Sequence, residues 1–231
     1  MKILCTICAR AGSKGVANKN LRLINSKPLI VYSIEQARAS NLFDQIVVSS
    51  DSAEIRSVAL ANGATYVVER PIEMASDTAP KLPAIRHCVE SAEKEFGKFD
   101  VIIDLDATAP LRHPEDIVGA LALLKSTNAD NVITGTPAHR SPYFNLVETD
   151  ENGVVHLSKP LQVAIVRRQD SPQCYDMNAS IYVWRHAALF ENETLFLANT
   201  RLFVMPRERS LDIDSQLDFE VVEWMMTKGN K

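Results

Sequence analysis

One short stretch of the chain, residues 9–20, gathers the residue types that bind a polyanion. It follows an apolar run and contains two glycines, a serine, two asparagines, an arginine and two lysines. Small residues let the backbone bend until several N–H groups converge, and the cations neutralise a bound anion. No P-loop or dinucleotide-binding glycine pattern is present. The expected ligand is a triphosphate, and the alternative is an ordinary basic surface turn.

Two carboxylates near the end of the chain, Asp212 and Asp214, are spaced to bind one metal ion. In extended backbone, residues two apart point the same way, and Ile213 between them points into the protein. Two carboxylates beside a triphosphate are what a Mg²⁺ ion that bridges protein and phosphate requires. The alternative is helix capping and dipole complementarity, which explains Asp214 and Asp218 but leaves Asp212 without a role.

The elements that must position these residues alternate between strands and helices. Apolar runs predict buried strands, at residues 3–8, 44–51, 65–68, 100–106 and 131–136. Amphipathic spacing predicts helices between them, at residues 29–39 with a cap in residues 25–28, at 52–62, at 79–96 and from His113 onward. This alternation predicts an α/β fold with a Rossmann-like, mainly parallel sheet flanked by helices. Such sheets bind ligands at the carboxyl ends of their strands, where residues 9–20 begin.

Residues 139–176 interrupt the alternation. Helical periodicity disappears, and apolar runs at residues 143–147 and 154–157 flank a polar turn, which predicts a β-hairpin. We expect residues 1–138 and 177–231 to form one domain, and residues 139–176 to form a lid, a dimerisation arm or both. Strands are expected again at residues 178–184 and 202–205, followed by a helix over residues 216–226.

Bulk properties bound the partners and the compartment. The net charge of −4 over 231 residues gives no electrostatic case for nucleic acid or an anionic membrane. No apolar run could span a bilayer, and the N-terminal run lacks a signal-peptide pattern, so we expect a cytoplasmic protein with a small-molecule partner. The four cysteines are expected to be reduced. Cys5 and Cys8 should lie on opposite faces of one strand and serve packing.

Five motifs occur in a characteristic order along the chain. They are Ala9-Arg10-x-Gly12-Ser13-Lys14-Gly15-x-x-x-Lys19-Asn20, Arg70-Pro71 with Ala75-Ser76-Asp77-Thr78, Thr108-x-Pro110-Leu111-Arg112, Asn178-x-x-Ile181-Tyr182 and Asp212-Ile213-Asp214-x-x-x-Asp218. In this order the chain resembles the N-acylneuraminate cytidylyltransferases, the CMP-sialic acid synthetase family, from residue 3 to about residue 226. The resemblance implies a nucleotidyltransferase-type fold, a homodimer, and Mg²⁺-dependent reaction of CTP with a nonulosonic acid to give the CMP-sugar and pyrophosphate.

The resemblance also implies roles for individual residues. The nucleotide would be bound by Arg10, Ala11, Gly12, Ser13, Lys19, Asn20 and Arg70, although an arginine on a loop such as Arg70 is commonly solvated instead. Arg10 and Lys19 would be catalytic together with the metal ligands Asp212 and Asp214. The sugar acid would contact Asp106, Phe144, Arg168, Asn178, Tyr182 and Phe196. Arg168, from the excursion of a partner subunit, would approach the sugar carboxylate, which suits its guanidinium group.

Two departures from the family's pattern concern the choice of sugar. Members acting on N-acetylneuraminate carry Gln-Pro-Thr-Ser-Pro where this chain has a carboxylate, Asp106, followed by Ala107 and Thr108. We expect Asp106 to accept from a sugar N–H or hydroxyl group or to join the metal shell. Phe144 replaces a lysine and suits a less hydroxylated chain, such as the 9-deoxy, 7-acylamido chain of legionaminic acid.

The hypothesis is therefore a CMP-legionaminic acid synthetase. The alternatives are CMP-N-acetylneuraminate synthetase proper, a 3-deoxy-octulosonate cytidylyltransferase, and a non-catalytic nucleotide-binding regulator, which would not need the paired acids.

Overall fold

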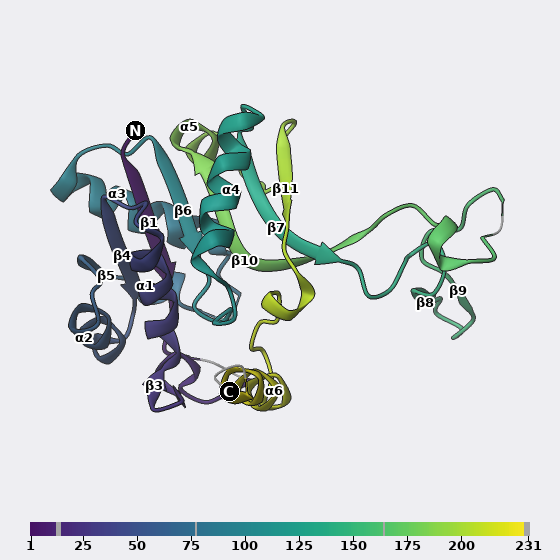
Figure 1. The fold of residues 1–231 in the computed structure, drawn as a ribbon, viewed down its shortest axis with the longest axis horizontal. Helices are drawn as coiled ribbons and strands as arrows, with labels where there is room; N and C mark the ends of the chain where they lie inside the picture. Colours follow the sequence, from purple (N-terminus) through teal and green to yellow (C-terminus); the bar gives the residue numbers. More distant parts are fainter. Residues whose placement is uncertain (13–14, 77, 164, 229–231) are drawn as a thin grey trace.

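The central feature of the fold is a twisted, mainly parallel sheet. The structure is a computed structural model that describes residues 1–12, 15–76, 78–163 and 165–228, and within these residues seven strands form one sheet in the order β11-β7-β10-β6-β1-β4-β5. The strands are β1 (Ile3–Cys8), β4 (Gln45–Ser50), β5 (Tyr66–Glu69), β6 (Val101–Leu105), β7 (Asn131–Pro137), β10 (Tyr175–Arg185) and β11 (Thr200–Val204). β10 runs antiparallel to both of its neighbours, while the other paired strands of this sheet are parallel. The predicted fold class is confirmed (Figure 1).

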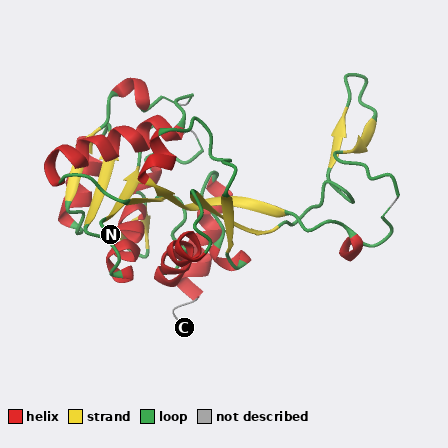
Figure 2. Cartoon of the chain, turned by 90° about the horizontal axis from the view of Figure 1, so that it is seen from above, coloured by secondary structure: helices red, strands yellow, loops and turns green. Residues whose placement is uncertain are grey.

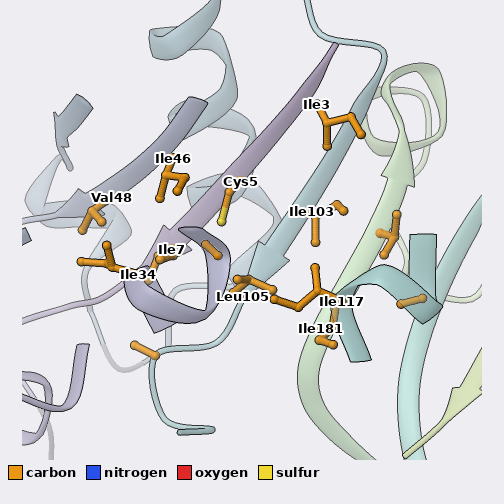
Figure 3. Packing of buried hydrophobic residues seen from close by; sticks show 14 of the residues in the cluster. Ile3, Cys5, Ile7, Ile34, Ile46, Val48, Ile103, Leu105, Ile117 and Ile181 are labelled. Carbon is orange, nitrogen blue, oxygen red and sulfur yellow. The ribbon is translucent and has the colours of Figure 1, made fainter. Parts of the chain in front are cut away.

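Helices cover both faces of the sheet. One face packs against α1 (Leu29–Ser40), α2 (Ala53–Ala61) and α4 (Pro114–Ser126), and the other packs against α3 (Lys81–Phe96) and α5 (His186–Phe190). Figure 3 shows the first face, where Cys5 and Ile7 of β1 meet Ile34 of α1. Cys8 packs against the other face, so the two cysteines lie on opposite sides of β1 as expected. Because both faces are covered, central strands such as β1 and β6 are largely apolar instead of alternating between apolar and polar residues.

A third apolar cluster joins the beginning of the chain to its end. It contains Val16 and Ile24 from the segment after β1, Ile213 from the segment that leads into α6 (Gln216–Lys228), and Phe219 from α6 itself. This segment after β1 also contains the 3₁₀ turn η1 (Lys19–Leu21) and the short strands β2 (Leu23–Ile24) and β3 (Lys27–Pro28). Burial of this cluster brings two distant parts of the sequence into contact.

The expected cap of the first helix is wrong in its details. Asn25 and Ser26 have positive φ values of 47° and 64° and form the turn between β2 and β3. A two-residue hairpin turn of this type requires positive φ at both positions, which asparagine tolerates. Pro28 occupies the N-cap position of α1, and no side chain of the described segment caps that helix.

Residues between β7 and β10 form an arm. It contains the short hairpin of β8 (Val147–Thr149) and β9 (Val155–Leu157), and the 3₁₀ turn η3 (Arg168–Asp170). Figures 1 and 2 show the arm projecting away from the sheet on the extended ends of β7 and β10. A hairpin around the predicted polar turn is confirmed, and its second strand lies where it was expected, but the first expected strand, at residues 143–147, is wrong: residues 142–145 form a turn and β8 begins at Val147. Two further 3₁₀ turns lie in the body, η2 (Ile72–Met74) and η4 (Arg207–Arg209). In the described part of the chain, no helix combines the length and apolarity needed to cross a bilayer.

Candidate active site

The loop after β1 is tied to its neighbours by its backbone and by one asparagine. The backbone N–H of Ala11 donates to the carboxylate of Asp51, which follows β4, over 2.9 Å. Asn20 donates from Nδ2 to the carbonyl of Arg10 over 2.9 Å and so holds the two ends of the loop together. The Oδ1 atom of Asn20 is buried and has no partner within the described residues. Ser13, a predicted nucleotide ligand, lies outside the described residues.

The loop contacts the acid pair directly. The ammonium group of Lys19 donates to the carbonyl oxygen of Ile213 and lies 3.3 Å from Oδ1 of Asp214. Gly15 approaches the same segment so closely that a Cβ atom there would overlap the carbonyl oxygen of Asp214. A residue with a side chain therefore cannot replace Gly15 without moving the backbone. The loop that was predicted to bind an anion thus lies against the segment that carries the two carboxylates.

The surroundings of Asp212 oppose its ionisation. Burial and the neighbouring charge of Asp214 raise the pKa of Asp212 to about 6, and the more distant charges of Asp106 and Asp218 act in the same direction. Asp218 has a structural role instead. Its Oδ2 atom accepts hydrogen bonds from the backbone N–H and the hydroxyl of Ser215, both over 2.7 Å. The helix-capping alternative therefore describes Asp218 and leaves Asp212 and Asp214 for another purpose.

The donor chemistry of Asp212 and Asp214 fits a hard divalent cation. Both supply carboxylate oxygens, and a cation would favour the ionised form of Asp212, whose pKa is raised first by burial and then by the charge of Asp214. Among the residues that the structure describes, no group of three or more His, Cys, Asp or Glu side chains could hold a metal by itself. The remaining ligands would have to be phosphate oxygens and water, as is common for Mg²⁺.

Arg70 follows β5 and is buried, so the alternative of a solvated loop arginine is wrong. Its Nη2 atom donates to the carbonyl oxygen of Ser49 over 2.8 Å, and its Nε atom donates to the hydroxyl of Ser49 over 3.2 Å. Ser49 lies near the carboxyl end of β4. The cation is therefore held at the same edge of the sheet as the loop.

A cavity of about 390 Å³ lies between the start of α3, β10 and residues 193–196. Tyr182 and Phe196, both expected to contact the sugar, line it, and the ring of Tyr182 stacks on that of Trp184 with centroids 5.4 Å apart. Its walls are mainly apolar, and Lys81 contributes a charged side chain. The cavity suits a ligand with an apolar part, and contact between these residues and a sugar stays a prediction.

Asp106 has contacts that were not foreseen. Its carboxylate accepts from Lys81 over 2.9 Å and from the backbone N–H and hydroxyl of Thr108 over 3.0 and 2.8 Å. Burial alone would raise the pKa of Asp106, but Lys81 and Thr108 outweigh it and lower the pKa to about 2. Asp106 is therefore ionised at neutral pH, and its carboxylate oxygens already accept hydrogen bonds from Lys81 and Thr108. Neither of the two expected roles describes these contacts.

Lys81 and Asp104 are the residues that sequence reasoning missed. Asp104 is fully buried in β6, accepts from the hydroxyl of Thr6 over 2.8 Å, and lies 3.0 Å from the ammonium of Lys81. Burial would lower the pKa of Lys81, but Asp104 and Asp106 raise it. Two signals could have found the pair. A carboxylate interrupted an apolar strand, and a cation began a helix, where the helix dipole disfavours it.

Two residues of the sequence motifs, Asn178 and Arg112, are buried and hydrogen-bond to segments that surround the site. Asn178 is buried, accepts from the hydroxyl of Thr134 over 2.6 Å, and donates to the hydroxyl of Ser210 over 3.0 Å. It thereby ties β10 to the segment that carries the acid pair. Arg112 is also buried, and its guanidinium group donates to Ser180 and Ser33. Burial lowers the pKa of Arg112 to about 10. A contact between Asn178 and a sugar stays a prediction.

The remaining two predicted sugar contacts lie on the arm. Arg168 donates from Nη2 to the carbonyl oxygen of Ala138 over 2.7 Å, and the backbone N–H of Phe144 donates to the carbonyl of Ser141. The arm projects away from the body of the same chain in both overall views (Figures 1 and 2). The structure therefore brings neither residue to the cavity of its own chain.

The fold is that of an α/β protein in which a glycine-containing loop after β1 lies against two neighbouring carboxylates, an arrangement typical of nucleotide-binding proteins. The sequence profile of the family described as Cytidylyltransferase matches residues 4–223, and the chain belongs to this family of CTP-dependent nucleotidyltransferases. The chain is 47% identical over 230 residues to "Post-translational flagellin modification protein B" of Campylobacter coli, covering 99% of this chain and 97% of that one.

Other similar proteins carry names that state an activity. "CMP-N,N'-diacetyllegionaminic acid synthase" of Campylobacter jejuni is 48% identical over 230 residues, with 99% of this chain and 97% of that one covered. "N-acylneuraminate cytidylyltransferase" of Streptococcus agalactiae is 30% identical over 95% of this chain and 52% of that one. The solved structure of CMP:2-keto-3-deoxy-manno-octonic acid synthetase complexed with CTP covers 99% of this chain and all of its own, with a TM-score of 0.73 and 18% identity, which supports the fold.

Proposed function

We propose that this cytidylyltransferase transfers CMP from CTP to a nonulosonic acid of the N,N'-diacetyllegionaminic type and releases pyrophosphate. The observation that carries the choice of sugar is the 48% identity, over 99% of the chain, to a relative named for that product. A relative named pseudaminic acid cytidylyltransferase is 33% identical over 95% of the chain. The apolar cavity that Tyr182 and Phe196 line supports a sugar with acylamido groups in preference to a fully hydroxylated one.

In the proposed complex, the loop after β1 binds the triphosphate. Its backbone N–H groups and three cations, Arg10, Lys19 and Arg70, surround the phosphates and offset their charge. The contact between Lys19 and Asp214 supports this assignment, because it places a cation at the point where the loop meets the acid pair. Catalysis of nucleotidyl transfer depends mainly on such positioning and charge neutralisation.

The proposed reaction is an in-line displacement at the α-phosphorus of CTP. The anomeric hydroxyl oxygen of the sugar forms a bond to that phosphorus, the bond from phosphorus to the leaving pyrophosphate breaks, and the hydroxyl proton passes to solvent. Asp212 and Asp214 would hold Mg²⁺, which when bound neutralises phosphate charge and stabilises the leaving group. Asn178 and Gly15 act indirectly, because they fix the segment that carries these acids.

The proposal includes a homodimer in which residues 139–176 act as a dimerisation arm. Several large apolar side chains of the arm are exposed in one chain, and Val163 and Val166 are 81% and 85% exposed. Such residues are commonly covered by a partner. A second copy would cover them and bring Arg168 and Phe144 to the neighbouring cavity. The reaction would take place in the cytoplasm, where CTP is available and the four free cysteines stay reduced.

The test is pyrophosphate release by the purified protein with CTP and Mg²⁺. Four sugar acids are compared: N,N'-diacetyllegionaminic, pseudaminic, N-acetylneuraminic and 3-deoxy-octulosonic acid. We expect kcat/KM to be highest for the first, by about tenfold or more. A preference for N-acetylneuraminic acid would overturn the choice of sugar, and no pyrophosphate with any of the four would favour a non-catalytic regulator.

A further inference from the structure

Lys81 and Asp104 each occupy an unfavourable position that the other explains. Lys81 is the first residue of α3, where the helix dipole disfavours a cation. Asp104 lies in the apolar strand β6 with no exposed surface, and a buried carboxylate needs a partner. The ammonium of Lys81 lies 3.0 Å from Oδ2 of Asp104 and 2.9 Å from Oδ2 of Asp106. The two carboxylates therefore hold Lys81 in one place.

The same ammonium group lies at the cavity. Lys81 lines the cavity with its side chain 36% exposed, and its Nζ atom lies 4.8 Å from the ring centroid of Tyr182. An ammonium group has three N–H donors. The hydrogen bond to Asp106 uses one of them, whereas Asp104 forms an ion pair with Lys81 at 3.0 Å but, within the described residues, no hydrogen bond at its Oδ2 atom, so a donor is left for a ligand in the cavity.

The charges around Lys81 decide what kind of acceptor it favours. One positive charge, that of Lys81, stands against the two negative charges of Asp104 and Asp106, while the carboxylate of Glu193 at the cavity is paired with Arg86 at 3.4 Å. An anionic group would meet net negative charge here, whereas a neutral acceptor would not. The walls beside Lys81 include Leu195 and Phe196, which favour an apolar group. A neutral carbonyl oxygen that carries a methyl group meets both conditions.

We propose that Lys81 is a specificity-determining residue that donates a hydrogen bond to the carbonyl oxygen of an acylamido substituent on the sugar acid. Asp104 and Asp106 are its positioning residues, and the acyl methyl group packs against Leu195 and Phe196. This inference rests on the proposed function, because it assigns the cavity to the sugar. It explains why a carboxylate, Asp106, follows β6: the carboxylate fixes the lysine that binds the sugar.

The test uses pairs of sugar acids that differ in one substituent. N-acetylneuraminic acid is compared with its 5-hydroxy analogue, and N,N'-diacetyllegionaminic acid with its 7-hydroxy analogue. We expect the wild-type protein to prefer the acylamido member of at least one pair by about tenfold in kcat/KM. In the Lys81→Met, Asp104→Asn double variant this preference should fall to near unity, with the KM for CTP unchanged. Removal of both charges together avoids an unpaired buried carboxylate in β6.

The Asp104→Asn single variant is an intermediate case, because it removes one positioning carboxylate and keeps the hydrogen bond from Lys81 to Asp106, so its preference should lie between those of the wild-type protein and the double variant. Equal losses for both members of each pair in the double variant would show that Lys81 has a structural role and would overturn the inference. If the double variant does not fold, Lys81→Arg decides, because it keeps the charge but moves the donors. An unchanged preference in Lys81→Arg would then contradict the inference. Failure of the wild-type protein to use any of these sugars would instead reject the proposed function.

Discussion

Asp212 and Asp214 are two residues apart, but their surroundings differ. Asp212 is half-buried, with a pKa raised to about 6, whereas Asp214 is exposed and lies 3.3 Å from the ammonium of Lys19. A site that stabilised the fold would not place two carboxylates together without a compensating charge for each. Perturbed groups of this kind are typical of functional sites. At the scale of single residues, the acid pair is therefore where function and stability can be separated by mutation.

The first prediction separates the two acids of the pair from the capping acid. Asp212→Asn should lower kcat by about a hundredfold or more, because it removes a proposed metal ligand. Its melting temperature at pH 7 should be unchanged or higher, because burial and Asp214 oppose ionisation of Asp212. Asp218→Ala should do the reverse: it loses the cap at Ser215 and about 1 kcal/mol of stability while activity largely remains. Full activity in Asp212→Asn would remove the metal assignment.

The second prediction concerns pH. Between about pH 4 and pH 6 the folded chain binds more protons at Asp212 than the unfolded chain does, so the contribution of this group to stability falls as pH rises through that window. Protons and a metal ion compete for the same carboxylate. The apparent affinity for Mg²⁺ should therefore weaken by about tenfold per pH unit below pH 6 and level off above it. Calorimetric titration of the wild-type protein and Asp212→Asn checks this, and an equally steep dependence in the variant would contradict it.

At the scale of elements, the loop after β1 and the segment before α6 act as one unit. Lys19 and Gly15 contact the backbone around Asp214, and Val16 shares a buried cluster with Ile213. The cradle therefore cannot be displaced without displacing the acid pair. This coupling explains why a glycine is required at the point of closest approach.

The third prediction compares two glycines of this loop. Gly15→Ala should lower the melting temperature and the activity together, because its Cβ atom would overlap the carbonyl oxygen of Asp214 and force the two segments apart. Gly12→Ala is the matched control, since no described atom lies within 4 Å of a Cβ atom placed there. Its melting temperature should stay within about 1 °C of the wild type, and any effect should be on the KM for CTP. Equal stability of both variants would contradict the described approach of the loop.

At the scale of the whole molecule, the arm formed by the residues between β7 and β10 stands apart, because it projects away from the body of its own chain (Figures 1 and 2). It carries two predicted sugar contacts, Phe144 and Arg168, and projects away from the cavity of its own chain (Figure 1). If a second copy completes the site, then each active site contains residues from two chains.

The fourth prediction tests this composition by mixing inactive variants. Arg168→Ala and Asp212→Asn are each expected to have low activity. If Arg168 serves the neighbouring chain, mixed dimers contain one intact site, and co-refolded samples should recover about a quarter of the wild-type activity. Mixing Asp212→Asn with Asp214→Asn is the control and should recover none, because both defects then lie in the same part of each chain. No recovery in the first mixture would show that Arg168 does not act across the interface.

The sequence determined those features that depend on local chemistry. Apolar runs marked the central strands, because a sheet covered on both faces buries most of their positions, and helical spacing marked α1 to α4. The residue types of the stretch 9–20 and the spacing of Asp212 and Asp214 indicated an anion cradle and an acid pair. Each of these signals comes from residues that are close together in the sequence, so it does not depend on how the chain packs.

Only the tertiary structure decided the contacts between distant segments. The burial of Arg70 on Ser49, the approach of Gly15 to Asp214, and the pairing of Lys81 with Asp104 and Asp106 depend on how loops and helices pack on the sheet. Asn25 is a local example, because the same residue suits a helix cap or a hairpin turn, and pairing of β2 with β3 decides between them. The energy of a contact depends on burial and distance, and neither is encoded in the spacing of two residues along the chain.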